Sequence, residues 1–200
     1  MRGEAPGAIR IVAGQWRGRK LAVPEGDAIR PTGERQRKAL FDILGHGKFA
    51  PGGVSCLQGA RVLDVFAGTG ALGLEALSRG AATCAFVERA AGARRALEAN
   101  IKATGAGPRA RLVVADAEKL PMAPPEPFAP ATLAFLDPPY RTDVAPGVLA
   151  SLSGRGWLAK GAVCVVELAE DEPFVPPAGF EPVDERTYSK TKFVFLSHGA

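Results

Sequence analysis

The sequence predicts a doubly wound α/β domain, in which a mostly parallel sheet carries helices on both faces. Short apolar runs alternate with stretches of helical periodicity from about residue 60 to residue 166, and such alternation is typical of parallel sheets. Residues 61–80 form the first unit: an apolar strand, a glycine-rich turn and a helix that ends at Gly80. Two later runs, 181–188 and 192–196, flank a tight turn and predict an antiparallel hairpin that closes the sheet.

The remaining elements continue this alternation in chain order. Residues 121–130 interrupt it, because so much proline excludes regular structure. Strands are expected over residues 62–66, 83–87, 110–115, 132–136 and 162–166, and helices over the stretch that ends at Gly80, over 90–104 and over 145–153. With the hairpin, these elements predict a seven-stranded sheet in a main domain that spans residues 60–200.

A small extension is expected before this domain. Residues 1–8 are rich in Gly, Pro and Ala and predict a disordered tail. Residues 9–45 predict two short strands around a basic loop, followed by a helix capped by Thr32. We expect the buried face of that helix to hold Gln36, Leu40, Ile43 and Leu44, with Arg35, Arg37 and Lys38 facing elsewhere. The Gly- and Pro-rich residues 46–59 predict a linker.

The charge of the chain is concentrated at its start. Residues 1–40 hold nine Lys or Arg and four Asp or Glu, a balance of +5, whereas the whole chain carries +4 and the other 160 residues therefore −1. A basic segment on a near-neutral body indicates a polyanion partner, with a merely solvated tail as the alternative. Trp16 in the basic loop suits either base stacking or packing. The residues expected to contact RNA are Arg10, Gln15, Trp16, Arg17, Arg19, Lys20, Arg30 and Arg35.

Several classes of protein are disfavoured by composition. No apolar run has the length of a membrane span, and the chain does not begin with an apolar signal region. The three cysteines are scattered and show no metal-ligand spacing, and the two histidines are far apart. We therefore expect a reduced, cytoplasmic protein without a metal site or a membrane partner.

The glycine turn of the first unit is compatible with either of two kinds of ligand. Gly68, Gly70 and Gly73 satisfy the G-x-G-x-x-G spacing of dinucleotide sites. Asp64 argues against that ligand, because a carboxylate at the strand end would repel a pyrophosphate. S-adenosyl-L-methionine carries a cationic sulfonium and amine and no phosphate, so acidic surroundings suit it. A structural turn that binds nothing is the third possibility.

Acidic side chains stand at three successive strand ends. Asp64, Glu88 and Asp116 each follow an apolar run, and the carboxyl ends of parallel strands form the edge where ligands bind in such folds. Glu88 is placed to accept hydrogen bonds from both ribose hydroxyls of a nucleoside. Three acids in sequence after a glycine-rich first loop indicate a nucleoside site at this edge.

The fourth strand runs into Asp137-Pro138-Pro139-Tyr140, which resembles the D-P-P-Y motif of methyltransferases that act on exocyclic amines of nucleobases. The lone pair of such an amine is drawn into the ring, so two fixed acceptors are needed to make the nitrogen tetrahedral and nucleophilic. The Asp137 carboxylate and the Pro138 carbonyl supply those acceptors, and proline stiffens the loop. Tyr140 offers a flat face to an extruded base. A proline-rich turn without a chemical role is the alternative.

Together these motifs resemble a known family. The stretches RIVAGQWRGRKL, RPTGERQRKALFDIL, VLDVFAGTGALGLEALSRGA, FVE, DPPY and ERTYSKTK are similar to the RsmD family of bacterial 16S ribosomal RNA guanine-N2 methyltransferases. The resemblance implies a Rossmann-like class I methyltransferase fold, S-adenosyl-L-methionine as cofactor, and 16S ribosomal RNA, in a partly assembled small subunit, as substrate of a monomeric enzyme. It implies that Asp116 binds the adenine amino group, Ala117 the ring and Asp64 the methionine end. The full expected cofactor set is Asp64, Phe66, Ala67, Gly68, Thr69, Gly70, Glu88, Asp116 and Ala117, and the catalytic set is Asp137, Pro138, Pro139 and Tyr140.

Two other functions remain open at this point. The D-P-P-Y motif is shared with adenine-N6 DNA methyltransferases, although 200 residues leave little room for a separate DNA-recognition domain. A dinucleotide-binding, dehydrogenase-like module would use the glycine turn but has no use for residues 137–140.

Overall fold

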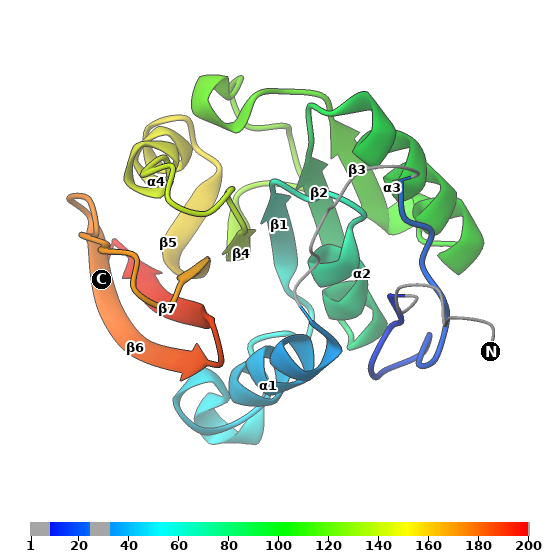
Figure 1. Ribbon diagram of the computed structural model, residues 1–200, viewed down its shortest axis with the longest axis horizontal. Helices are drawn as coiled ribbons and strands as arrows, with labels where there is room; N and C mark the ends of the chain where they lie inside the picture. Colours follow the sequence, from blue (N-terminus) through cyan, green and yellow to red (C-terminus); the bar gives the residue numbers. More distant parts are fainter. Residues whose placement is uncertain (1–8, 25–32, 200) are drawn as a thin grey trace, which may run out of the picture.

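The computed structural model describes residues 9–24 and 33–199. The tail 1–8, Arg30 and the Thr32 cap lie outside these residues. Seven strands form one sheet in the order β3-β2-β1-β4-β5-β7-β6 (Figure 1). The strands are β1 Arg61–Val65, β2 Thr83–Val87, β3 Ala110–Val113, β4 Ala131–Leu136, β5 Leu158–Ala169, β6 Phe180–Tyr188 and β7 Thr191–His198.

The pairing confirms the predicted fold class. The strands β1 to β5 pair with one another in parallel, whereas β7 runs antiparallel between β5 and β6. The strand order reverses between β1 and β4, and a crevice at such a point is the usual ligand site of doubly wound sheets. The structure extends β5 to twelve residues, well beyond the predicted 162–166, because pairing with β4 already begins at Leu158 and pairing with β7 continues to Ala169.

Helices cover both faces of the sheet. The helices α1 Glu34–Leu44, α2 Ala71–Ser78 and α3 Ala91–Thr104 bury their apolar side chains in one core, and α4 Ala145–Gly154 buries its own in a second. Figure 1 shows α4 across the sheet from α1 and α2. Successive strand residues point to opposite faces, so Leu133 and Phe135 of β4 join the first core while Ala134 and Leu136 join the second.

The segment 9–24, called the arm below, does not form the two predicted strands. Its backbone still closes a hairpin, with an isolated antiparallel bridge between Arg10 and Lys20 and hydrogen bonds from the amides of Ile11 and Leu21 to the carbonyls of Arg19 and Ile9, at 3.0 and 2.8 Å. The Glu75 carboxylate of α2 instead accepts hydrogen bonds from the amides of Val12 and Ala13, at 2.6 and 3.0 Å. These amides are therefore bound by a side chain of the main domain, which prevents a regular ladder. Ile9, Ile11 and Leu21 are buried in the first core, so the arm packs on the domain.

Helix α1 differs from its predicted orientation in one respect. Arg37, expected on the outer face, is 2% exposed and lies on the buried face with Leu40, Phe41 and Leu44. Its guanidinium donates a hydrogen bond to the Arg10 carbonyl of the arm, at 2.7 Å. Gln36 and Ile43 are only half-buried. The arm thus gives the charged group of Arg37 a partner inside the protein, which periodicity alone does not reveal.

The segment predicted as a linker is folded onto the domain. Residues 46–59 carry two short 3₁₀ helices, η1 Gly47–Phe49 and η2 Pro51–Gly53. Phe49 is buried, with its ring centroid 5.1 Å from that of Phe195 in β7. Leu57 is also buried in the first core. As predicted, residues 121–130 contain neither a helix nor a strand.

Candidate active site

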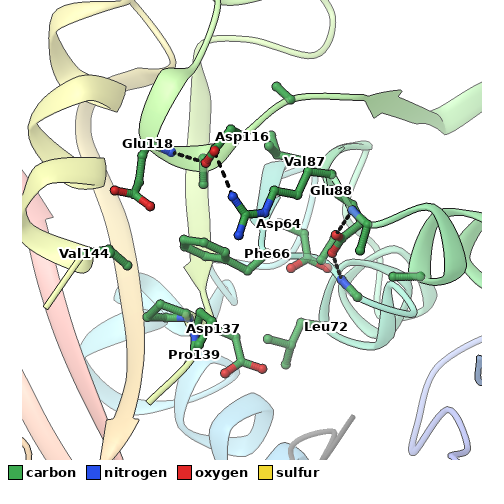
Figure 2. A pocket seen from close by; sticks show the side chains of 18 of the residues that line it. Asp64, Phe66, Leu72, Val87, Glu88, Asp116, Glu118, Asp137, Pro139 and Val144 are labelled. Carbon is green, nitrogen blue, oxygen red and sulfur yellow. Dashed lines mark hydrogen bonds and ion pairs between the residues drawn. The ribbon is translucent and has the colours of Figure 1, made fainter. Parts of the chain in front are cut away.

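A cavity of about 650 Å³ opens at the carboxyl ends of the strands, next to the point where the strand order reverses. All but one of the residues predicted for the cofactor and for catalysis line it, and Figure 2 shows Asp64, Glu88, Asp116 and Asp137 around it. Asp64 comes from the end of β1, and Phe66, Ala67, Gly68 and Thr69 come from the loop after it. The loops after β2 and β3 contribute Glu88, Asp116 and Ala117, and the loop after β4 contributes Asp137, Pro138, Pro139 and Tyr140. Gly70 is the one residue of the predicted set that does not line the cavity.

The glycine turn uses its glycines for different purposes. Gly68 and Gly70 have φ of 55° and 77°, in the left-handed region that favours glycine. A Cβ at Gly68 would meet no atom closer than 3.9 Å, whereas one at Gly70 would lie 2.4 Å from Leu97. A Cβ at Gly73 would lie 2.4 Å from the Phe86 ring. Gly68 therefore shapes the cavity wall, while Gly70 and Gly73 allow α2 and α3 to approach the sheet closely.

Glu88 holds the loops on either side of it. Its two carboxylate oxygens accept hydrogen bonds from the amides of Gly68 and Ala90, at 2.8 and 2.7 Å (Figure 2). A carboxylate oxygen has a second lone pair, so each remains able to accept from a ligand. Only 8% of the residue is exposed, which gives the carboxylate a fixed position at the cavity.

Asp64 lies at the base of the cavity and is almost completely buried. Its carboxylate accepts a hydrogen bond from the Gly73 amide, at 2.9 Å. Burial raises the pKa of Asp64 to about 8, against the opposing effect of this bond and with a further increase from the nearby Glu88. A cation in the cavity would favour the ionised form of this buried acid.

Asp116 begins a short 3₁₀ helix, η4 Ala117–Lys119, on the opposite side of the cavity. Its carboxylate accepts from the Glu118 amide at 3.1 Å and from the Arg89 guanidinium at 2.9 Å. The hydrogen bond from Glu118, followed by that from Arg89, lowers the pKa of Asp116. This acid therefore stays ionised near neutral pH, unlike Asp64.

The 137–140 loop is fixed at both ends. The Asp137 amide donates to the Val65 carbonyl of β1 at 3.3 Å, and the Thr142 hydroxyl donates to the Pro139 carbonyl at 2.7 Å. Loss of solvation, followed by the charges of Glu167 and Asp64, raises the pKa of Asp137 well above its ordinary value. Tyr140 keeps 45% of its surface exposed, so one side of the residue is open to a ligand.

Two residues at this site escaped sequence reasoning. Glu167, near the carboxyl end of β5, is 3% exposed, and its carboxylate accepts a hydrogen bond from the Tyr140 hydroxyl. Arg89 lines the cavity beside Asp116. A lone acid within the apolar run 162–169 was the available signal for Glu167. Nothing in the sequence marked Arg89, because it simply follows Glu88.

The predicted RNA-contacting residues divide into three groups. Arg17, Arg19 and Lys20 are exposed on the arm, where the Arg19 guanidinium also donates to the Ala103 carbonyl of α3, and Arg35 is exposed on α1. Gln15 and Trp16 are used for docking: the Gln15 side chain donates to the Leu77 carbonyl at 3.4 Å, and the Arg109 guanidinium lies 5.2 Å from the Trp16 ring centroid. Arg10 is half-buried and donates to the Gly18 carbonyl.

No helix within 9–24 and 33–199 is long and apolar enough to cross a membrane. Over the same residues, no group of three or more His, Cys, Asp or Glu is placed to hold a metal ion.

The residues around the cavity fit S-adenosyl-L-methionine. Acidic side chains at its base and sides suit a cationic sulfonium and amine, and the open space at Gly68 admits a ligand close to the backbone. A doubly wound sheet with a reversed hairpin at its end and this cavity at the switch point define a class I S-adenosylmethionine-dependent methyltransferase. A solved RNA methyltransferase from Salinibacter ruber, in complex with S-adenosyl-L-homocysteine, has the same fold: its TM-score is 0.61 and its identity 12%, over 84% of this chain and 93% of that one.

The family is shown by closer relatives. The family model described as "Conserved hypothetical protein 95" matches residues 9–197. The ribosomal RNA small subunit methyltransferase D of Escherichia coli K12 is 40% identical over 161 residues, which cover 80% of this chain and 75% of the relative. The solved structure of yhhF from Escherichia coli is 36% identical with a TM-score of 0.79, over 97% of this chain and 99% of that one. The chain belongs to the RsmD methyltransferase family, which confirms the predicted family, fold and methyl donor.

Proposed function

We propose that this enzyme transfers a methyl group from S-adenosyl-L-methionine to the exocyclic N2 amine of a guanine in 16S ribosomal RNA. One observation carries the proposal: residues 137–140 and the glycine turn line the same cavity. An amine held at Asp137 would therefore face a methyl donor held between Asp64, Glu88 and Asp116. The similarity to small-subunit ribosomal RNA methyltransferases supports the choice of substrate.

The cofactor residues divide by chemistry. Bound S-adenosyl-L-methionine supplies a methyl group activated by a positively charged sulfur. Glu88 accepts the ribose hydroxyls through the free lone pairs of its oxygens, and Asp116 with the Ala117 amide holds the adenine. Asp64 stabilises the cationic methionine end, which favours the ionised form of this buried acid. Phe66, Ala67, Gly68 and Thr69 form the wall against which the cofactor packs.

Residues 137–140 prepare the amine for attack. The Asp137 carboxylate and the Pro138 carbonyl accept the two N–H groups and direct the nitrogen lone pair toward the methyl carbon. This orientation, fixed before the reaction, is the main source of the rate increase. As the N–CH₃ bond forms and the S–CH₃ bond breaks, the nitrogen loses a proton. Asp137 must be ionised to accept that proton, and the positive charge of a bound methyl donor favours this form against the raised pKa of the buried carboxyl.

The arm offers a second contact for the RNA, away from the cavity. Arg17, Arg19 and Lys20 are exposed and meet phosphates, near the ends of α2 and α3 that lie opposite the cavity, while Tyr140 stacks on the extruded guanine. Trp16 serves to anchor the arm, since its backbone amide donates to the Ser78 hydroxyl at 3.0 Å. We propose a monomeric, cytoplasmic enzyme that acts on a partly assembled small subunit.

The test is nucleoside mass spectrometry after incubation with labelled S-adenosyl-L-methionine, using small-subunit ribosomal RNA, partly assembled subunits and DNA in parallel. N2-methylguanine in the ribosomal RNA is expected. N6-methyladenine in DNA would instead support the adenine alternative. Asp137→Ala should lower turnover by about 10²–10³-fold, the cost of losing one preorganised polar contact, with cofactor affinity little changed. Near-normal turnover in that variant would contradict the mechanism.

A second test addresses the arm. Replacing Arg17, Arg19 and Lys20 together by glutamine should raise KM for RNA and flatten its salt dependence, because each lost phosphate contact removes roughly 0.7–0.9 from the log–log slope. Cofactor affinity should be unchanged. Arg155→Gln is a control for loss of an exposed charge near α4, across the sheet from the helices that hold the arm. Unchanged RNA kinetics in the triple variant would show that these three charges are merely solvated and do not bind RNA.

A further inference from the structure

Asn100 joins the arm to the cofactor loop. It lies in α3 and is 1% exposed. Its side-chain oxygen accepts from the Ala22 amide at 2.7 Å, and its NH₂ group donates to the Ala22 carbonyl at 3.1 Å and to the Thr69 carbonyl at 2.9 Å. One buried amide therefore binds both backbone groups of an arm residue and one backbone group of the glycine turn.

The hydrogen bonds of Asn100 depend on the positions of the arm at Ala22 and of the glycine turn at Thr69. Thr69 stands between Gly68 and Gly70, and it lines the cavity. Ala22 and Val23 are exposed and belong to no strand, so Asn100 supplies the backbone partners that a sheet would otherwise provide. The buried Asn100 amide makes three hydrogen bonds, which use both its N–H donors and its oxygen acceptor. Breaking any of them by moving the partner away would cost free energy.

The rest of the arm follows the same two helices. Its first part binds Glu75 and Ser78 of α2, the helix that begins directly after Gly70. Its last part reaches the start of α3, where a Cβ at Gly92 would lie 3.8 Å from Pro24. The nearby Ala90 and Ala93 line the cavity. Figure 1 shows the arm beside α2 and α3. The arm is thus attached to both helices that support the cofactor loop.

We propose that Asn100 is a positioning residue that couples the arm to the cofactor loop, so that cofactor binding orders the arm and RNA bound to the arm strengthens cofactor binding. The coupling must be reciprocal, because an effect of one ligand on the affinity of another is shared equally by both. The part of this inference that concerns RNA rests on the function proposed above. The link between loop and arm does not.

The test uses S-adenosyl-L-homocysteine and no RNA. In the wild-type protein, this ligand should slow amide hydrogen exchange at Ala22 and its neighbours about fivefold or more, the lower end of typical coupling. In Asn100→Ala the arm should exchange faster and lose this response to the ligand, and the ligand Kd should rise about fivefold or more. A variant that retains both the ligand-dependent protection of the arm and the wild-type Kd would overturn the proposal.

Thr104→Ala is the matched control. Thr104 is also buried on α3, but its hydroxyl donates only to carbonyls of its own helix. It should keep the Kd and the ligand-dependent protection; an equal loss in both variants would assign the effect to general weakening of α3 and overturn the proposal. If Asn100→Ala does not fold, Asn100→Asp carries the same test, since it keeps the acceptor for the Ala22 amide and loses both donated bonds. Because RNA is absent, failure here is distinguishable from failure of the proposed methylation.

Discussion

The Tyr140 hydroxyl lies 3.2 Å from a carboxylate oxygen of Glu167 and 3.2 Å from the hydroxyl oxygen of Thr191. Tyr140 belongs to the loop after β4, whereas its partners lie on β5 and β7, the antiparallel pair at the far side of the cavity. The sheet therefore holds the hydroxyl end of the ring and leaves the rest of Tyr140 available to a base. Burial raises the pKa of Tyr140 to about 12, against the opposing hydrogen bond with Thr191 and with further increases from Glu167 and Asp137, so the phenol stays protonated as a donor.

Removal of this hydroxyl should affect turnover more than cofactor binding. Tyr140→Phe loses a hydrogen bond to a charged group, worth about 1.5–3 kcal/mol, so a decrease in kcat of roughly 10–100-fold is expected. Glu167→Gln keeps an oxygen acceptor for the hydroxyl and should lose less. Steady-state kinetics with both variants, together with calorimetry of S-adenosyl-L-homocysteine, check this. Equal kcat in wild type and Tyr140→Phe would show that the ring needs no such support.

Glu88→Ala should weaken binding of S-adenosyl-L-homocysteine by about 1.5–3 kcal/mol, the range for hydrogen bonds to charged groups. The reason is the loss of a carboxylate that faces the cavity while its oxygens also bind the Gly68 and Ala90 amides. Isothermal calorimetry measures the change, with thermal unfolding to confirm the fold. Glu98→Ala, at an exposed position on α3, is the control and should bind normally. Tight NAD binding by the wild type would contradict the assignment of the site.

Asp64 should make stability depend on pH. Its pKa is raised to about 8 in the folded protein, so the folded state retains a proton that the unfolded state releases. Stability from this group is complete below its ordinary pKa and is lost as pH rises toward 8. Between pH 6 and 9 the loss should reach about 2–3 kcal/mol, at 1.36 kcal/mol per pKa unit. Asp64→Asn removes this titration. In denaturant unfolding, the free energy of unfolding of the variant should therefore rise relative to that of the wild type as pH increases. A difference that is constant over this range would be inconsistent with a buried, protonated Asp64.

Gly73 and Gly147 should respond oppositely to alanine. A Cβ at Gly73 would lie 2.4 Å from Phe86 and 2.6 Å from the Cys84 sulfur, whereas one at Gly147 in α4 would meet nothing within 4 Å. Gly73→Ala should therefore cost about 1–3 kcal/mol through overpacking. Gly147→Ala should stabilise the protein by roughly 0.5–1 kcal/mol, because alanine favours the helix. Chemical denaturation of both variants measures these changes. A neutral Gly73→Ala would mean that α2 can move away from the sheet at little cost.

The sequence by itself determined the order of elements, the glycine turn and most of the cavity residues, because each depends on local patterns. Apolar runs followed by Gly68 or by Asp137-Pro138 place those residues at strand ends, and parallel strands bring all such ends to one edge. Motif similarity then indicated the family and the methyl donor.

Only the tertiary structure decided which distant groups meet. Glu167 reaches Tyr140 because β5 extends beside β4 and β7, and a single acid in an apolar run does not indicate its partner. The arm remains without strands, and Arg37 is buried, because side chains and carbonyls from segments far along the chain satisfy the backbone and the guanidinium there. Asn100 binds Ala22 and Thr69 for the same reason: long-range contacts arise from packing, which no local pattern encodes.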